Sequence, residues 1–169
     1  MSTWHDSFTE SFHRRRIANF INIPNDGCFK DKRSSPVSQE TATLKKIFSI
    51  GGSSGWYYGN FFWMIRGLAD RMVGGVGLRR GRRHAHTLEP GDPVDFWRVL
   101  YASTEEKRLL LFAEMKLPGE AWLEFEIKDG MLYQTATFRP LGLAGRLYWW
   151  AVWPFHGFIF NGMLRKLCE

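Results

Sequence analysis

Glu114, Glu124 and Glu126 are the residues of this chain whose type and spacing could serve proton transfer. A carboxyl group held away from water has a raised pKa and can donate or accept a proton. By strand alternation, however, Glu124 and Glu126 lie opposite the apolar residues of their strand, which favours a solvated outer face. A catalytic role for Glu114 or Glu124 requires a bulge, or a second buried face, that turns the side chain inward. The sequence leaves both interpretations open.

Other patterns of reactive residues are weaker. His84 and His86 are two residues apart, so on a strand they would point the same way, but no third zinc ligand lies nearby. Cys28 and Cys168 are far apart and lack metal-ligand spacing, and a disulfide is not expected in a cytosolic chain. No Gly-x-Gly-x-x-Gly follows a predicted strand. We therefore predict neither a metal nor a bound cofactor.

The net charge is +6, and much of it lies in two runs, Arg14–Arg16 and Arg79–Arg83. Such runs could bind phosphate groups, lipid headgroups or nucleic acid. The second run is equally typical of a solvated loop or an edge strand protected by charge. Because aromatic residues are not interleaved with it and no nucleic-acid-binding motif is present, we do not predict nucleic acid as a partner.

Aromatic residues make up 16% of the chain, with 14 Phe, 8 Trp and 5 Tyr. This excess indicates an aromatic-lined cavity or an apolar surface that meets a partner. We predict that the cavity is lined from the strands and the last helix, with Arg139 and the two glutamates Glu114 and Glu124 orienting the ligand. The predicted ligand-binding residues are Trp97, Met115, Trp122, Tyr133, Arg139, Trp149 and Trp153.

Hydrophobic periodicity and turn residues predict the order of the elements. The second helix is predicted from apolar residues at three- and four-residue steps (Phe61, Met64, Ile65, Leu68 and Met72). A strand is predicted at 30–38, helices at 39–50 with Ser38 as N-cap and at 56–73, strands at 94–101, 108–116, 122–128 and 131–139, and a helix at 142–167. Asp129-Gly130 is a strong signal for a two-residue hairpin between the last two strands.

The alternation of side chains predicts how these elements pack. Leu109, Leu111 and Ala113 share one face of their strand, and Leu123 and Phe125 share one face of the next. One face of an antiparallel sheet is therefore buried and must be covered. The covering element is the C-terminal helix, kinked at Pro154. This predicts an α+β fold in which a curved antiparallel sheet wraps around a long C-terminal helix and leaves room for a ligand.

The apolar stretch Leu141–Leu164 is long enough to cross a bilayer. Arg146, His156, Pro154 and four glycines interrupt it, which favours a terminal helix of a globular domain. The N-terminus lacks the pattern of a signal peptide. We expect a cytoplasmic protein that is not transmembrane, although contact with a membrane surface stays possible.

Several segments resemble a bacterial family of unknown function. They are Ile50–Gly52, Gly55–Tyr58, Arg66–Leu68, Val73–Arg83, Asp95–Val99, Ala113–Gly119, Ala121–Phe125 and Pro154–His156. The resemblance spans about residues 31–167. It implies a START-like helix-grip fold, similar to polyketide cyclases and the birch pollen allergen, and a frequent fusion to a Rossmann domain resembling short-chain dehydrogenases. We divide the chain into an N-terminal extension, 1–28, and a START-like domain, 29–169.

Three functional hypotheses follow from the sequence. The first is a binding module for a hydrophobic or aromatic small molecule. The second is an enzyme of the cyclase or hydratase type that uses Glu114 or Glu124. The third is an accessory domain that contacts a Rossmann-type protein or a membrane surface. The sequence alone does not name the ligand or establish catalysis.

Overall fold

The computed structural model describes residues 21–51, 53–75, 77 and 86–169. In these ranges one antiparallel sheet has the strand order β1-β6-β5-β4-β3-β2. The strands are β1 (Phe29–Pro36), β2 (Pro93–Val94), β3 (Trp97–Ser103), β4 (Arg108–Ala113), β5 (Gly119–Lys128) and β6 (Met131–Pro140). Strands β3 to β6 form a meander, and β1 pairs with β6 along the far edge.

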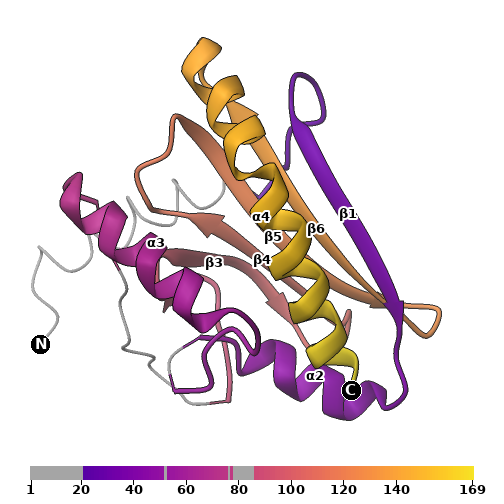
Figure 1. Cartoon of the computed structure of the whole chain (residues 1–169). Coiled ribbons are helices and arrows are strands. Elements are labelled where there is room, and N and C mark those ends of the chain that lie inside the picture. Colours follow the sequence, from indigo (N-terminus) through magenta and orange to yellow (C-terminus); the bar gives the residue numbers. More distant parts are fainter. Residues whose placement is uncertain (1–20, 52, 76, 78–85) are drawn as a thin grey trace, which may run out of the picture.

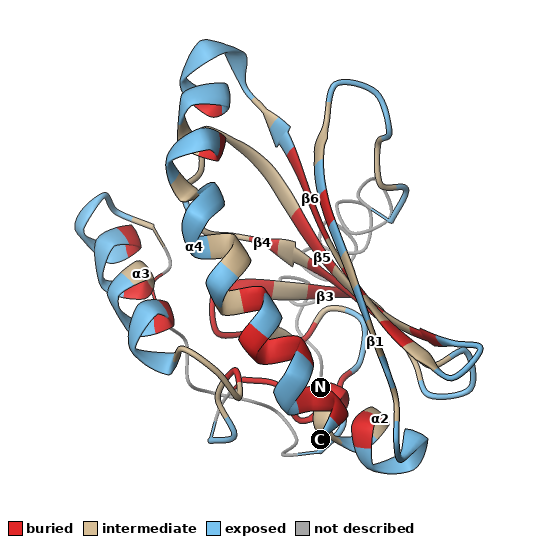
Figure 2. Ribbon diagram, turned by 45° about the vertical axis from the view of Figure 1, so that its right-hand side comes forward, coloured by how far each residue is buried: buried red, intermediate tan, exposed pale blue. Residues whose placement is uncertain are grey.

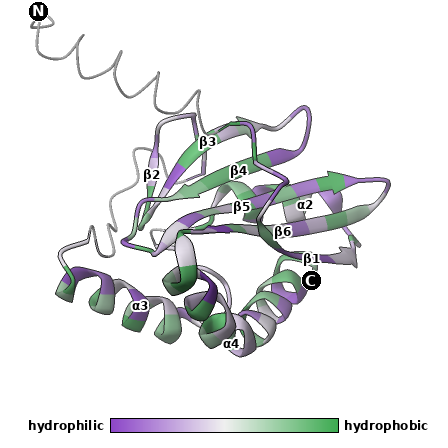
Figure 3. Ribbon diagram, turned by 90° about the horizontal axis from the view of Figure 1, so that it is seen from above, coloured by the Kyte–Doolittle hydropathy of each residue, from purple (hydrophilic) through white to green (hydrophobic). Residues whose placement is uncertain are grey.

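Two helices form a layer on the concave side of this sheet, α3 (Asn60–Met72) and α4 (Gly142–Cys168). Helix α4 packs over one side of the sheet, and α3 lies beside α4. Helix α2 (Glu40–Phe48) lies at the C-terminal end of α4 (Figure 1). Seen from above, α3 and α4 occupy the same side of the sheet (Figure 3). The predicted α+β helix-grip fold is therefore confirmed.

The strands agree closely with the pattern read from the sequence. The β5–β6 hairpin turns at Asp129-Gly130, where both residues have positive φ (51° and 73°) and Lys128 pairs with Met131. This backbone suits the right-handed twist of the flanking strands. The first predicted meander strand is divided in two, because Asp95 and Phe96 form a tight turn between β2 and β3.

The helix boundaries differ from the sequence predictions at the N-termini. Helix α2 has Gln39, and not Ser38, at its N-cap position. Helix α3 begins at Asn60 and not near Trp56, because Tyr57 and Gly59 adopt positive φ and interrupt the helical backbone before it. Helix α4 is continuous through Pro154.

Helix α3 buries the face opposite to its apolar stripe. Its buried residues are Trp63, Gly67 and Asp70. The apolar residues whose spacing predicted the helix are exposed instead, and much of the α3 ribbon is coloured as exposed (Figure 2). Phe61 and Leu68 are each 62% exposed, and Met72 is 80% exposed. The periodicity therefore predicted a helix correctly but not the face that it buries.

The main core lies between the concave face of the sheet and the helices. It includes Leu109, Leu111, Leu123, Phe125 and Met163, which confirms the predicted alternation. A second cluster lies on the outer face of the sheet, where Leu100, Leu110 and Trp122 are buried beside Ile23 and Phe112. The outer face is thus partly apolar, which the alternation alone did not predict.

Several sequence predictions lie outside the described residues, namely those on Arg14–Arg16, on Arg79–Arg83 and on His84. Across the ranges that are described, no helix combines the length and the hydropathy needed to cross a bilayer.

Close packing at one helix glycine yields a stability prediction. A Cβ at Gly145 of α4 would lie 2.3 Å from the carbonyl oxygen of Pro118 and 2.8 Å from Cα of Pro140, both backbone atoms that cannot turn aside. We expect Gly145→Ala to lower the free energy of unfolding by about 2 kcal/mol, as overpacking does. Urea unfolding, monitored by circular dichroism, measures this change.

Gly157 of the same helix is the matched control. The nearest atom to a Cβ there is Arg33 Nη2, at 3.8 Å. Gly157→Ala should raise the free energy of unfolding by up to about 1 kcal/mol through helix propensity alone. Equal effects at the two positions would contradict the packing argument.

Candidate functional site

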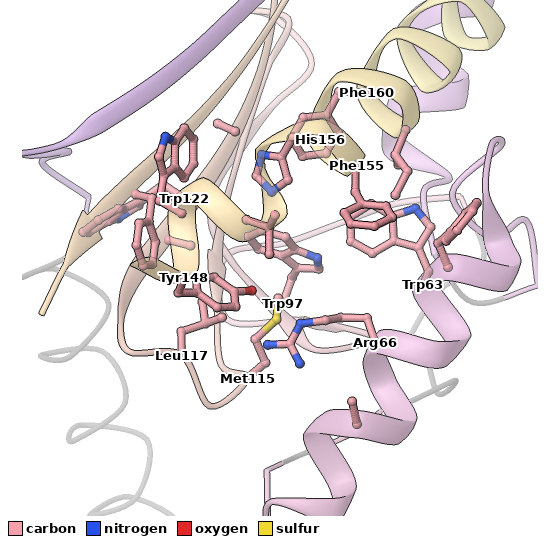
Figure 4. Close-up of a pocket in the computed structure, with 18 of the residues that line it drawn as sticks. Trp63, Arg66, Trp97, Met115, Leu117, Trp122, Tyr148, Phe155, His156 and Phe160 are labelled. Carbon is pink, nitrogen blue, oxygen red and sulfur yellow. The ribbon is translucent and has the colours of Figure 1, made fainter. Parts of the chain in front are cut away.

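A cavity of about 340 Å³ lies between the concave face of the sheet and helices α3 and α4 (Figure 4). Most of its wall is aromatic or aliphatic, which is typical of sites for apolar ligands. Residues from β3, β5, β6 and the segment after β4 form the floor, and helices α3 and α4 form the sides. The lining includes Phe62, Trp63, Trp97, Met115, Leu117, Ala136, Phe138, Trp149, Phe155 and Phe160.

The polar part of the wall is small. Arg66 from α3 and Tyr148 from α4 extend toward Met115 from opposite sides (Figure 4). Arg66 Nη2 donates a hydrogen bond to the backbone oxygen of Lys116, 3.4 Å away. Thr137 and His156 complete the polar side chains of the lining. These groups could orient a ligand that is otherwise held by apolar contact.

Trp63 attaches α3 to the core. Its ring stacks on that of Trp56, with centroids 4.7 Å apart, and lies 5.6 Å from the ring of Phe96. Trp56 is itself fixed, because its Nε1 donates a hydrogen bond to Asp95 Oδ2 at 2.7 Å. Asp95 adopts a positive φ of 54°, a conformation that Asp tolerates better than most residues. The tight β2–β3 turn thus positions one wall of the cavity.

Asp70 fixes the C-terminal end of α3. Its side chain is fully buried. Its Oδ1 accepts a hydrogen bond from the backbone N–H of Lys116 at 2.7 Å, and its Oδ2 accepts one from the N–H of Gly77 at 2.9 Å. These bonds join α3 to the segment after β4 and compensate the cost of burying the carboxylate.

The guanidinium of Arg33 holds helix α4 to the edge strand β1. The Arg33 guanidinium pairs with Asp31, with Nη2 2.9 Å from Oδ2. The same guanidinium donates to Asn161 Oδ1 at 2.5 Å. Because Asp31 and Arg33 both lie on the α4 side of β1, these contacts tie α4 to the edge of the sheet.

His156 is a titratable residue of the lining that is kept neutral. Its pKa is lowered from 6.5 to about 4, mainly by burial; the nearby Asp31 opposes this shift and Arg33 adds to it. Its ring lies between those of Trp149 and Phe160, at 5.3 and 4.7 Å. Among the described residues its Nδ1 has no hydrogen-bond partner. The wall near His156 is therefore uncharged at neutral pH.

Four of the predicted ligand-binding residues line the cavity, namely Trp97, Met115, Trp122 and Trp149. Trp122 also belongs to the outer cluster, where its ring meets that of Phe112 at 5.5 Å. Their role in binding stays a prediction.

The other three predicted ligand-binding residues lie outside the lining. Tyr133 has the opposite strand parity to Ala136, and Lys32 Nζ lies 4.9 Å above its ring. Arg139 is about half exposed and pairs with Glu120. Trp153 is 40% exposed and contacts Trp149 with centroids 5.3 Å apart. A binding role for these three residues stays a prediction.

Glu114 and Glu124 also lie outside the lining, each in an ion pair. Arg98 Nε lies 2.9 Å from Glu114 Oε1. Arg108 Nη2 lies 2.6 Å from Glu124 Oε1. Glu124 occupies the outer face, because its neighbour Leu123 faces the core. Neither carboxylate is part of the cavity lining, and a catalytic role for either stays a prediction.

Sequence reasoning missed the contribution of α3, which supplies Phe62, Trp63, Ile65 and Arg66, and that of His156 from α4. A usable signal was the density of aromatic residues around 56–63, which exceeds what one packed helix face needs. Metal binding finds no support in the described part of the chain, where no three His, Cys, Asp or Glu side chains gather as a site would require.

Fold and cavity together define an α+β helix-grip domain with an apolar interior cavity. The chain belongs to the family described as Protein of unknown function (DUF2867), which matches residues 23–163. No curated protein matches the sequence.

Solved structures with similar architecture share little sequence with this chain. A protein from Thermobifida fusca has 15% identity and a TM-score of 0.43, covering 82% of this chain and 92% of its own. A hypothetical protein from Helicobacter pylori has 11% identity and a TM-score of 0.46, with coverages of 89% and 91%. The protein Ara h 8.0201 has 12% identity and a TM-score of 0.40, with coverages of 83% and 98%.

The partly buried, neutral His156 predicts a pH dependence of stability. Its folded pKa of about 4 lies below the 6.5 of the unfolded chain, so the unfolded state binds the proton more readily between these values. The free energy of unfolding should therefore fall as the pH drops from 6.5 to 4, by about 3 kcal/mol at most from this residue. Urea unfolding at pH 7 and pH 4.5 measures the effect.

His156→Gln is the comparison, because it keeps a polar side chain that does not titrate. Other carboxylates also titrate in this window, so the informative quantity is the difference between the pH slopes of the two proteins. The variant should lose less stability on acidification than the wild type. Parallel slopes would show that His156 is not the buried base inferred above.

Proposed function

We propose that this protein is a binding module for a hydrophobic or aromatic small molecule, held between the sheet, α3 and α4. The observation that carries the proposal is the cavity of about 340 Å³ with a predominantly aromatic and aliphatic wall. Its volume falls in the range of about 300–1,000 Å³ typical of ligand pockets. A well-packed core of this size would not ordinarily contain so large a space.

Apolar burial can supply much of the free energy of such binding. A ligand that buries about 300 Å² of apolar area gains about 7 kcal/mol. That gain is comparable to the binding free energy of a micromolar complex, and the entropy lost on association reduces it. Arg66 is the charged side chain of the lining, so we expect a ligand that is neutral or carries a hydrogen-bond acceptor rather than a cation.

A cyclase or hydratase activity is the alternative for the same cavity. Its supporting residues, Glu114 and Glu124, pair with Arg98 and Arg108 away from the lining. A proton transfer in the cavity would therefore need Tyr148 or His156 instead. The family resemblance also implies a Rossmann-type partner. The presence of the cavity is neither evidence for that partner nor evidence against it.

Filling the cavity tests the binding proposal. Ala136 on β6 faces the cavity, whereas Thr135 has the opposite parity. Ala136→Phe should reduce the affinity for the apolar dye anilinonaphthalene sulfonate at least tenfold, because the added ring occupies ligand space. Thr135→Phe adds the same ring on the outer face and should leave the affinity unchanged. Dye fluorescence titration measures both, and circular dichroism verifies folding.

Native mass spectrometry of the purified protein, followed by denaturing extraction, would identify a copurified molecule. A bound apolar compound in the wild type and its loss in Ala136→Phe would support the proposal. Equal dye binding by the wild type and both folded variants would overturn it, since the dye would then occupy another surface.

A further inference from the structure

The exposed sides of α3 and α4 each carry an apolar stripe at helical spacing. On α3 the stripe consists of Phe61, Ile65, Leu68 and Met72, joined by Met64. On α4 it consists of Leu143, Leu147, Trp150 and Phe158, joined by Phe155. We call these residues the α3/α4 face. All are at least 46% exposed. Soluble proteins do not normally present two such stripes to water without a binding role.

The two stripes form one surface. Both helices lie in the same layer on one side of the sheet (Figure 3). Phe62 of α3 meets Phe158 of α4 with ring centroids 6.3 Å apart, and Phe61 lies 6.0 Å from Phe62. From this contact the helices diverge (Figure 1). The α3/α4 face is therefore continuous where the helices meet.

The charged side chains that the two helices expose have a single sign. Arg71 and Arg146 are exposed on the two helices, and Lys116 is exposed beside the end of α3, where its Nζ contacts the backbone oxygen of Val73. The one acidic residue of α3 is Asp70, which is fully buried, and residues 142–168 of α4 contain no Asp or Glu. An exposed apolar surface surrounded by cations complements an anionic interface with an apolar interior.

We propose that the α3/α4 face docks on the surface of a membrane that contains anionic lipids. The aromatic and aliphatic side chains enter the boundary between headgroups and acyl chains, and Arg71, Arg146 and Lys116 contact the headgroups. Ile65 and Phe155 of this face both line the cavity and are exposed, so the face borders the cavity. An apolar ligand could then move between bilayer and cavity without crossing water. The docking itself does not depend on the proposed ligand binding.

Cosedimentation of the full chain with vesicles tests this proposal. The probes are vesicles of phosphatidylcholine alone and of phosphatidylcholine with phosphatidylglycerol. We expect binding to the anionic vesicles, weakened by added salt. Leu68→Glu and Leu147→Glu change side chains that are each 62% exposed, so folding should be preserved, and each should reduce vesicle affinity at least tenfold. Arg71→Gln combined with Arg146→Gln should weaken binding to anionic vesicles severalfold.

Ala42→Glu is the matched control, because it places the same new charge at an exposed position of α2. It should retain wild-type binding. Docking is refuted if the wild type binds neither kind of vesicle. It is also refuted if Leu68→Glu and Leu147→Glu bind anionic vesicles as well as Ala42→Glu does. Concentration-dependent dimers in the ultracentrifuge that disappear in Leu68→Glu, without vesicle binding, would assign the face to a second copy instead.

Different results would refute the ligand-binding proposal and the membrane-docking proposal. Ala136→Phe alters the cavity and leaves the α3/α4 face unchanged, so it should lose dye binding and retain vesicle binding. Leu147 lies outside the cavity lining, so Leu147→Glu should lose vesicle binding and retain dye binding. If the wild type binds vesicles but no dye, ligand binding fails while docking stands.

Discussion

The stacking of Trp63 on Trp56 is the interaction on which the arrangement of the helix layer depends. Trp63 is the large apolar side chain that α3 buries, and the hydrogen bond from Trp56 to Asp95 fixes the surface on which it rests. With this anchor, α3 stands beside α4 without closing onto the sheet. The space that remains becomes the cavity, and the opposite side of α3 is left facing solvent.

Much of the fold could be predicted because strands carry a strict two-residue period. Leu123 and Phe125 faced the core as their alternation required, and Asp129-Gly130 formed the expected turn. The same period was ambiguous on β6, where both sets of alternate residues contain large side chains. Tyr133 and Arg139 share the parity that faces outward, whereas Ala136 and Phe138 face the cavity. Register, which depends on the partner strand, decided between them.

The candidate site was harder to predict because it depends on which face of a helix is covered. Periodicity locates an apolar stripe, but it does not say whether protein, ligand or bilayer lies against it. On α3 the stripe of Phe61 and Leu68 faces outward, and a polar residue, Asp70, is buried instead. A buried Asp is rare unless hydrogen-bonded, and its partners come from residues that the sequence places far apart.

The attachment of α3 at its two ends has a consequence for motion. Gly59, at the N-cap with a φ of 67°, and the Gly74-Gly75 pair after Met72 flank the helix, and no ladder hydrogen bond of the sheet passes through it. Swinging α3 outward therefore breaks the Trp63 stack and the Asp70 bonds but leaves the β-meander intact. If the proposed ligand enters this way, its admission requires only a local opening, whose free-energy cost is separate from that of global unfolding. Changing these contacts therefore shifts the population of the open form while the β-meander stays folded.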